Sequence, residues 1–138
     1  MNIPLALGFA ALFSGGLSLF LNKVAVSNGV YLPPWMLLIS LIHIVAALVL
    51  HGIQKGPLYL SPRMIGLGGL CGVLAVASYV AWMRALEMGG QGSVIFPLAG
   101  LAIIVAVPLS FIFHNEPVTA TKLVGLGLGV GSITLLSR

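Results

Sequence analysis

Long apolar runs separated by short polar turns fill the chain from end to end. A helix crosses the hydrocarbon core of a bilayer with about 20 predominantly apolar residues. Five runs are close to this length, and they cover residues 3–21, 34–50, 64–86, 92–113 and 121–136. The pattern predicts an all-α integral membrane protein with five transmembrane helices, forming a single transmembrane domain over residues 1–138.

Polar and helix-breaking residues mark the ends of these runs. The first run stops at Asn22, and Pro34 suits the start of a helix in the second. Thr119 is expected to cap the last run, which is short and rich in glycine. Pro97 and Pro108 fall inside the fourth run, where neighbouring helices can bond the carbonyls that a proline leaves free. The fourth run is therefore predicted to be one span with both prolines inside it.

The composition supports a lipid environment and narrows the function. Hydrophobic residues make up 59% of the chain and charged residues 6%, whereas a soluble domain needs about a quarter charged. The net charge of +4 is too scattered for a nucleic-acid footprint. Cys71 is the one cysteine, and no Cys/His metal spacing occurs, so we expect no intrachain disulfide, metal or cofactor. Without a basic leader region, the first run is expected to be a retained helix.

The basic residues divide evenly between the two sides that five spans would define. Lysine and arginine in short loops normally decide which side is cytoplasmic. The two groups of three are Lys55, Arg63 and Lys122 on the N-terminal side, and Lys23, Arg84 and Arg138 on the other. The absence of a bias predicts dual topology and an antiparallel homodimer. The alternative is that a chain with few charges is balanced by chance.

Glycines recur at close spacing in the last run. Small residues four apart let helix backbones approach each other in lipid, which offers helices no hydrophobic reason to associate. The glycines concerned are Gly125, Gly127, Gly129 and Gly131. They predict a helix-contact surface, and a dimer seam and intrachain packing are both open interpretations.

Polar or aromatic stripes in three runs are the candidate substrate-binding residues. Polar groups are costly inside a bilayer, so their arrangement carries information about function. The stripes are Ser14, Ser18 and Asn22 in the first run, Ser40 and His43 in the second, and Ser78, Tyr79 and Trp82 in the third. Together they predict a shared pocket. Alternatively, each serine bonds its own helix and Trp82 belongs to the interfacial aromatic belt.

His43 is the strongest single candidate because it lies near the middle of the second run. An imidazole can bind a substrate by hydrogen bonding or exchange a proton at ordinary pH, so proton coupling is one option. The alternative is a neutral, structural imidazole bonded to Ser40 or to a facing helix. Arg84 is expected to form an interfacial pair with Glu87. In the alternative, Arg84 or Lys23 faces a vestibule and attracts anionic substrates.

Three stretches occur in a characteristic order. Residues 14–25 read SGGLSLFLNKVA, and residues 78–86 read SYVAWMRAL. Pro97 is followed by Glu116-Pro117-Val118-Thr119 and then by the glycines from Gly125 to Gly131. In order and spacing, these stretches resemble EamA-type members of the drug/metabolite transporter superfamily.

The resemblance covers nearly the whole chain and fits one five-helix repeat. It implies a secondary transporter that moves a small organic metabolite or drug-like solute by alternating access, in a bacterial or archaeal inner (plasma) membrane. Larger members carry two inverted repeats, so a lone repeat implies a dimer that rebuilds a ten-helix, inverted-repeat transporter. The related small multidrug resistance proteins rely on a carboxylate in the first helix. Ser14 and Ser18 are the polar side chains in the middle of that run here, which argues against exchange at a membrane-embedded glutamate.

Other functions are compatible with the same pattern. One is a non-transporting membrane subunit of a larger complex, and another is a flippase component for a lipid-linked substrate. An enzyme is not expected, because the acids and histidines do not assemble a nucleophile, a base and an orienting group. With only two acidic residues, neutral or zwitterionic substrates are favoured over multivalent cations.

Overall fold

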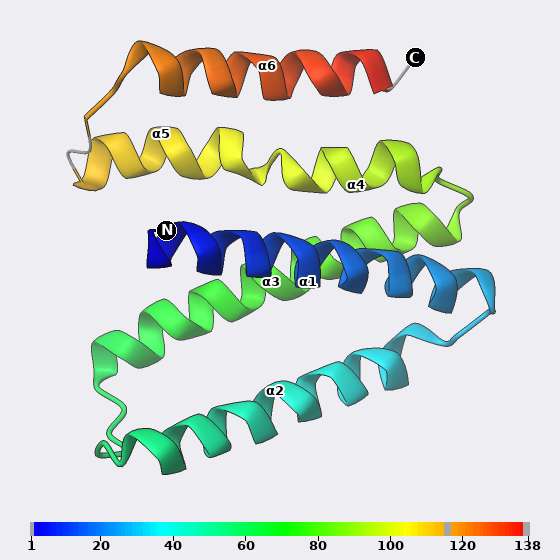
Figure 1. The fold of residues 1–138 in the computed structure, drawn as a ribbon. Helices are drawn as coiled ribbons and strands as arrows, with labels where there is room; N and C mark the ends of the chain where they lie inside the picture. The colour runs from blue at the N-terminus through cyan, green and yellow to red at the C-terminus, as the bar shows by residue number, and fades with distance from the viewer. Residues whose placement is uncertain (1, 115–116, 137–138) are drawn as a thin grey trace. The chain divides into compact units, whose positions relative to one another are not determined.

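The computed structural model describes residues 2–114 and 117–136, and every regular element in them is a helix. The helices are α1 (Ile3–Ser27), α2 (Leu32–Gln54), α3 (Pro62–Glu87), α4 (Gly92–Gly100), α5 (Ala102–His114) and α6 (Ala120–Leu136) (Figure 1). The prediction of an all-α chain is confirmed for the described residues. Glu116 of the sequence motif and Arg138 of the charge count lie outside them.

Four segments are long and apolar enough to cross a membrane. They are α1, α2, α3 and the segment Gly92–His114, which contains α4 and α5. With 17 residues, α6 is a shorter apolar helix. It measures about 25 Å at about 1.5 Å per residue, against a hydrocarbon core of about 30 Å. The five-span topology therefore remains a prediction.

The chain divides into two compact units. The first unit contains residues up to Lys23 and those from Ala85 onward, and the second runs from Val24 to Arg84. Within the first unit, α6 packs beside α4 and α5 (Figure 1). The second unit contains α2 and most of α3.

The C-terminal ends of α3 and α1 are capped in the same way. Gly89 has a φ of 90°, a left-handed conformation that suits glycine. The Gly90 amide donates to the Ala85 carbonyl at 2.9 Å, and the Gly89 amide donates to Leu86 at 3.1 Å. The end of α1 has the same pair of bonds around Gly29, whose φ is 69°. Both helices thus end in a Schellman motif, which satisfies their last carbonyls.

The first helix continues past Leu21, where the first span was expected to end. The Asn22 side-chain amide donates to the Ser18 carbonyl at 2.8 Å. The Lys23 ammonium group donates to the Gly90 carbonyl at 3.1 Å. Because both polar groups find partners without leaving helical geometry, this pair does not terminate the helix.

The fourth span is found as one candidate membrane segment, Gly92–His114, but its helix is interrupted. It divides into α4 and α5 at Leu101, whose amide donates to the Pro97 carbonyl at 3.1 Å. The Ile104 amide then bonds Leu101 at 2.8 Å, a tight turn in place of the α-helical pattern. Gly100 weakens helix formation immediately before this point, and Pro97 and Pro108 each lack an amide donor.

The starts of two helices follow the sequence signals. The Thr119 hydroxyl accepts a hydrogen bond from the Lys122 amide at 3.3 Å, so the predicted cap of the last helix is confirmed. α2 begins at Leu32, two residues before the predicted Pro34, with proline in its first turn. The amide N–H that proline lacks would have no hydrogen-bond partner in the first turn of a helix.

Few of the described residues are buried within the chain. The buried residues are Ala25, Leu32, Met83, Leu86 and the polar Asn22. Most large apolar side chains of the six helices are exposed, including Phe9, Leu41 and Leu70. An apolar surface this extensive needs lipid or another protein to cover it. The protein is therefore an integral membrane protein in contact with the bilayer.

Candidate functional site

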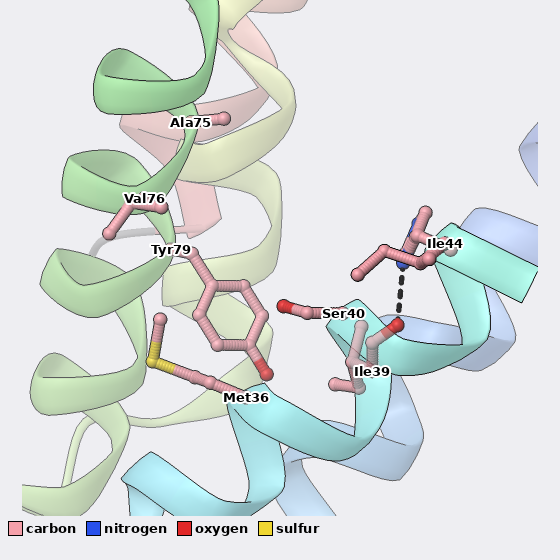
Figure 2. A pocket seen from close by; sticks show the side chains of 8 residues that line it. Met36, Ile39, Ser40, Ile44, Ala75, Val76 and Tyr79 are labelled. Atoms are coloured by element: carbon pink, nitrogen blue, oxygen red, sulfur yellow. Dashed lines mark hydrogen bonds between the residues drawn. The ribbon is translucent and has the colours of Figure 1, made fainter. Parts of the chain in front are cut away.

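A hollow of about 460 Å³ lies within the second unit, between α2 and α3. Its lining residues are Met36, Ile39, Ser40, His43 and Ile44 of α2, and Ala75, Val76 and Tyr79 of α3 (Figure 2). The volume falls in the range of small-molecule sites, about 300–1,000 Å³. The lining is mainly apolar, with the hydroxyls of Ser40 and Tyr79 and the imidazole of His43 as its polar groups.

A second hollow, of about 500 Å³, adjoins the first. Its lining residues are Leu32, Pro33, Met36, Leu37 and Ser40 of α2, and Val80 and Arg84 of α3. Met36 and Ser40 line both hollows, which places the two side by side along α2. We refer to the two hollows together as the α2–α3 groove. It extends from His43 at one end to Arg84 at the other.

Tyr79 is held between aromatic neighbours in this groove. Its ring projects from α3 toward Met36 and Ser40 of α2 (Figure 2). The Trp82 ring packs edge-on against it, with centroids 5.0 Å apart and planes at 76°. The side chain of Trp35 is hydrogen-bonded to that of Tyr79. Because an indole N–H can only donate, the Tyr79 oxygen accepts this bond. These two contacts restrict the rotation of the ring at the groove wall.

The hydrogen bond of His43 defines the chemistry that its ring offers. Nδ1 lies 2.8 Å from the Ile39 carbonyl oxygen, one turn back on the same helix. A carbonyl oxygen only accepts, so Nδ1 carries the hydrogen of this bond. In the neutral ring, Nε2 is then the nitrogen with a free lone pair. His43 can accordingly accept a hydrogen bond or a proton without giving up its bond to Ile39.

Three of the predicted site residues come together in the groove, namely Ser40, His43 and Tyr79. The others do not line it. Trp82 contacts the Tyr79 ring from outside the lining. Ser78 and Ser18 are exposed on their helices, and Asn22 is buried with 4% of its surface exposed.

In the first helix, Ser14 agrees with the alternative interpretation, in which a serine bonds a carbonyl of its own helix. The Ser14 hydroxyl donates to the Ala10 carbonyl at 2.9 Å, which satisfies it within its own helix. The Asn22 amide likewise bonds the carbonyl of Ser18. These bonds give both side chains a local role in α1. Their predicted part in substrate binding remains a prediction.

The four glycines of α6 do not pack closely against other described parts of the chain. A methyl group added at Gly125, Gly127, Gly129 or Gly131 would meet no such atom within 4 Å. Close intrachain packing at these four positions is therefore not found in the described residues.

The start of α6 forms a smaller hollow of about 290 Å³ against α5. The Lys122 ammonium group lies 5.4 Å from the centre of the Phe111 ring and donates to the Pro117 carbonyl at 3.0 Å. This lysine is thus bound locally at the helix start.

Sequence reasoning missed the apolar lining of the site and the tryptophan of α2 beside it. Met36 lines both hollows, and Trp35 fixes Tyr79. Met36 lies four residues before Ser40 on the same helix face, and this spacing could have identified it. Arg84 lines the second hollow, and its place in a vestibule stays a prediction.

Long apolar helices with exposed hydrophobic surfaces and a groove of ligand size define a polytopic membrane protein. A family model described as the EamA-like transporter family matches residues 2–138. The chain belongs to this family, which is part of the drug/metabolite transporter superfamily, and the resemblance found in the sequence is confirmed. Searches of curated proteins and of solved structures found no match.

Proposed function

We propose that the protein is a secondary transporter that moves a small organic metabolite across the plasma membrane by alternating access. The α2–α3 groove in a member of a transporter family is the observation that carries this proposal. It combines an apolar wall with a few polar groups, which is the usual make-up of small-molecule sites. His43, Ser40 and Tyr79 would contact the substrate.

The working unit in this proposal is an antiparallel homodimer that forms ten spans. Three observations support it: the balanced lysine and arginine count, the space beside each of the four glycines of α6 and the exposed apolar surface of the helices. Glycine faces permit close helix packing between subunits in lipid. Rocking of two inverted halves about a central site is a recurrent plan among transporters.

The direct test is selective solute movement through reconstituted protein. Proteoliposomes would be filled with a defined mixture of organic metabolites, and the loss of each solute would be followed by mass spectrometry. We expect saturable loss of a few chemically related solutes. Loss equal to that from protein-free liposomes for every solute in the mixture would contradict the proposed function.

A matched pair of variants tests whether the groove lies on the transport path. Ser40→Phe places a ring where both hollows meet, so we expect the selective flux to fall at least tenfold. Leu41→Phe adds a ring at the next residue, which is exposed and outside the groove lining, and should leave the flux within about twofold. Equal flux in the two variants would show that the groove is not on the transport path.

Flipping of a lipid-linked substrate is the second candidate function. It is favoured by the open form of the groove, which the described part of the second unit does not enclose. A flippase would move a head-group-labelled lipid between leaflets of the same proteoliposomes. Lipid movement without release of any water-soluble solute would favour this function over metabolite transport.

A further inference from the structure

We propose that the connection between α2 and α3 binds the head groups of anionic phospholipids at the membrane surface. The connection lies between Gln54, the last residue of α2, and Pro62, the first residue of α3 (Figure 1). We call residues 55–63 the basic turn, because Lys55 begins it and Arg63 ends it. These residues lie outside the lining of the α2–α3 groove, so lipid binding here is independent of the proposed transport function.

The position of the basic turn follows from the two helices that it joins. Both α2 and α3 are candidate membrane spans. They have 23 and 26 residues, which at about 1.5 Å per residue corresponds to about 35 and 39 Å. The hydrocarbon core of a bilayer is about 30 Å thick, so helices of this length reach the head-group layer. The connection between them therefore lies at the level of the lipid phosphates.

The charge of the basic turn favours a negatively charged partner. Lys55 and Arg63 are exposed, and neither side chain has a hydrogen bond or ion pair in the described part of the chain. The two acids of the sequence, Glu87 and Glu116, both belong to the first unit, so the second unit contains no acidic residue. Lysine and arginine next to a membrane surface are attracted to anionic lipids. A lipid phosphate is thus the group of opposite charge that both side chains can reach from the membrane surface.

The centre of the basic turn is apolar, which favours a lipid over a small anion. Leu58, Tyr59 and Leu60 are exposed by 75%, 70% and 64%. The Tyr59 amide donates to the Pro57 carbonyl at 2.9 Å, a bond within the turn itself. Tyrosine is enriched where head groups meet the hydrocarbon core, and lipid covers leucine side chains that water would not. Inorganic phosphate could compensate the two cations but would leave this apolar centre in water.

The other described turns lack this combination of charge and apolar surface. Residues 28–31, between α1 and α2, contain no charged residue. Residues 88–91, between α3 and α4, directly follow Glu87, whose carboxylate would repel an anionic head group. Among these described turns, anionic lipid is therefore expected to gather at the basic turn.

A fluorophore in the basic turn would report which lipids gather there. Gly56→Cys in a Cys71→Ser background leaves one thiol, and a Cβ atom at residue 56 meets no described atom within 4 Å. The purified full chain, labelled with bimane, would be placed in phosphatidylcholine nanodiscs. A small, fixed fraction of the lipid would be phosphatidylglycerol or phosphatidylcholine with a nitroxide on the same acyl carbon near the head group. Both leaflets then have one composition, so the orientation of the chain does not affect quenching.

We expect phosphatidylglycerol to quench the bimane about threefold more strongly than phosphatidylcholine at equal mole fraction. The preference should decrease in high salt, which screens exposed charges. Equal quenching by the two lipids would overturn the proposal. Inorganic phosphate, added at constant ionic strength, should leave the preference unchanged. Loss of the preference on adding phosphate would indicate a small-anion site and would also overturn it.

Charge variants test the assignment to the two cations. Lys55→Gln should lower the preference for phosphatidylglycerol, and adding Arg63→Gln should abolish it. Lys23→Gln is the matched control, because the five-span topology places Lys23 at the other membrane surface and glutamine can still donate to the Gly90 carbonyl. A preference that persists in the double variant would contradict the assignment, as would equal losses in Lys55→Gln and Lys23→Gln. Helical content by circular dichroism shows whether each variant is folded.

Leu58→Ser tests the apolar part of the surface. Loss of the apolar side chain should move the basic turn away from the lipid, so quenching by both nitroxide lipids should fall by the same factor. The preference for phosphatidylglycerol should be kept, because Lys55 and Arg63 are unchanged. Quenching equal to that of the unsubstituted turn would show that its apolar centre does not enter the lipid, which would contradict this part of the proposal.

Discussion

Gly90 lies in the turn between α3 and α4, against the carbonyl oxygen of Ala85. A Cβ atom at this position would be 2.5 Å from that oxygen and 3.0 Å from Cγ1 of Ile95. The first of these neighbours is backbone and is hydrogen-bonded to Gly90 itself, so it cannot move away cheaply. The turn therefore depends on the absence of a side chain at this residue.

We predict that Gly90→Ala destabilises the folded chain by roughly 1–3 kcal/mol, because the turn must open to admit the methyl group. The same shift would disturb the carbonyl that accepts the Lys23 hydrogen bond. Thermal unfolding in detergent, followed by circular dichroism, measures the effect. Gly56→Ala is the control, since a methyl group there meets nothing within 4 Å. Equal unfolding midpoints for the two variants would refute the prediction.

Single polar residues were the hardest part of the site to predict. Residue spacing correctly placed Ser40 and His43 on one helix face, and both line the groove. The same reasoning could not show that Ser14 bonds its own helix, because a serine hydroxyl has a carbonyl within reach in any helix. Nor could it show that His43 bonds Ile39, which sets the tautomer. Periodicity determines the face of a residue but not its hydrogen-bond partner.

Among the helices, the break at Leu101 is the feature that sequence reasoning placed least well. The apolar run was continuous, and prolines are tolerated in membrane helices, so one span was expected. Helix-breaking tendencies combine here within a short distance: Gly100 lies between Pro97 and Pro108. By contrast, helix starts and ends with one decisive residue, such as Thr119 and Gly89, follow directly from local chemistry.

We predict that Gly100→Ala closes this break. The added methyl group has open space, and alanine favours helix over glycine by roughly 0.5–1 kcal/mol. Hydrogen–deuterium exchange in micelles should become several-fold slower in the peptide that contains Leu101 to Ile104. Gly15→Ala provides the comparison, because it gains the same propensity inside the unbroken α1 and should not affect that peptide. Unchanged exchange in Gly100→Ala would mean that the prolines alone maintain the break.

At the scale of the whole molecule, the composition alone predicts that lipid surrounds most of the chain. A chain with 6% charged residues has too little polar surface for water, and the exposed apolar helices agree with that inference. Family membership could also be recognised, because the motifs extend over nearly the whole chain. The pairing of chains could not be derived in this way. It depends on contacts between copies, and the charge balance only predicts that neither orientation is favoured.

The charge balance leads to a prediction about insertion of the whole chain. A single cysteine at Gly56 in a Cys71→Ser background would report the exposure of the α2–α3 turn to an impermeant reagent on intact cells. With no lysine and arginine bias, we expect about half of the molecules to be labelled before lysis and the rest only after it. Labelling that is complete or absent would mean one fixed orientation. An antiparallel homodimer would then be ruled out, and an oppositely oriented partner chain would be needed.

One added lysine on either side should shift this balance in opposite directions. Gln54 ends α2 on the N-terminal side of the proposed topology, and Gln91 precedes α4 on the other side. Because lysine-rich loops stay in the cytoplasm, Gln54→Lys should lower the labelled fraction at residue 56 and Gln91→Lys should raise it. A shift in the same direction for both variants would show that stability rather than charge decides the outcome. Opposite shifts would show that the even count of basic residues holds the chain between two orientations, as an antiparallel pair requires.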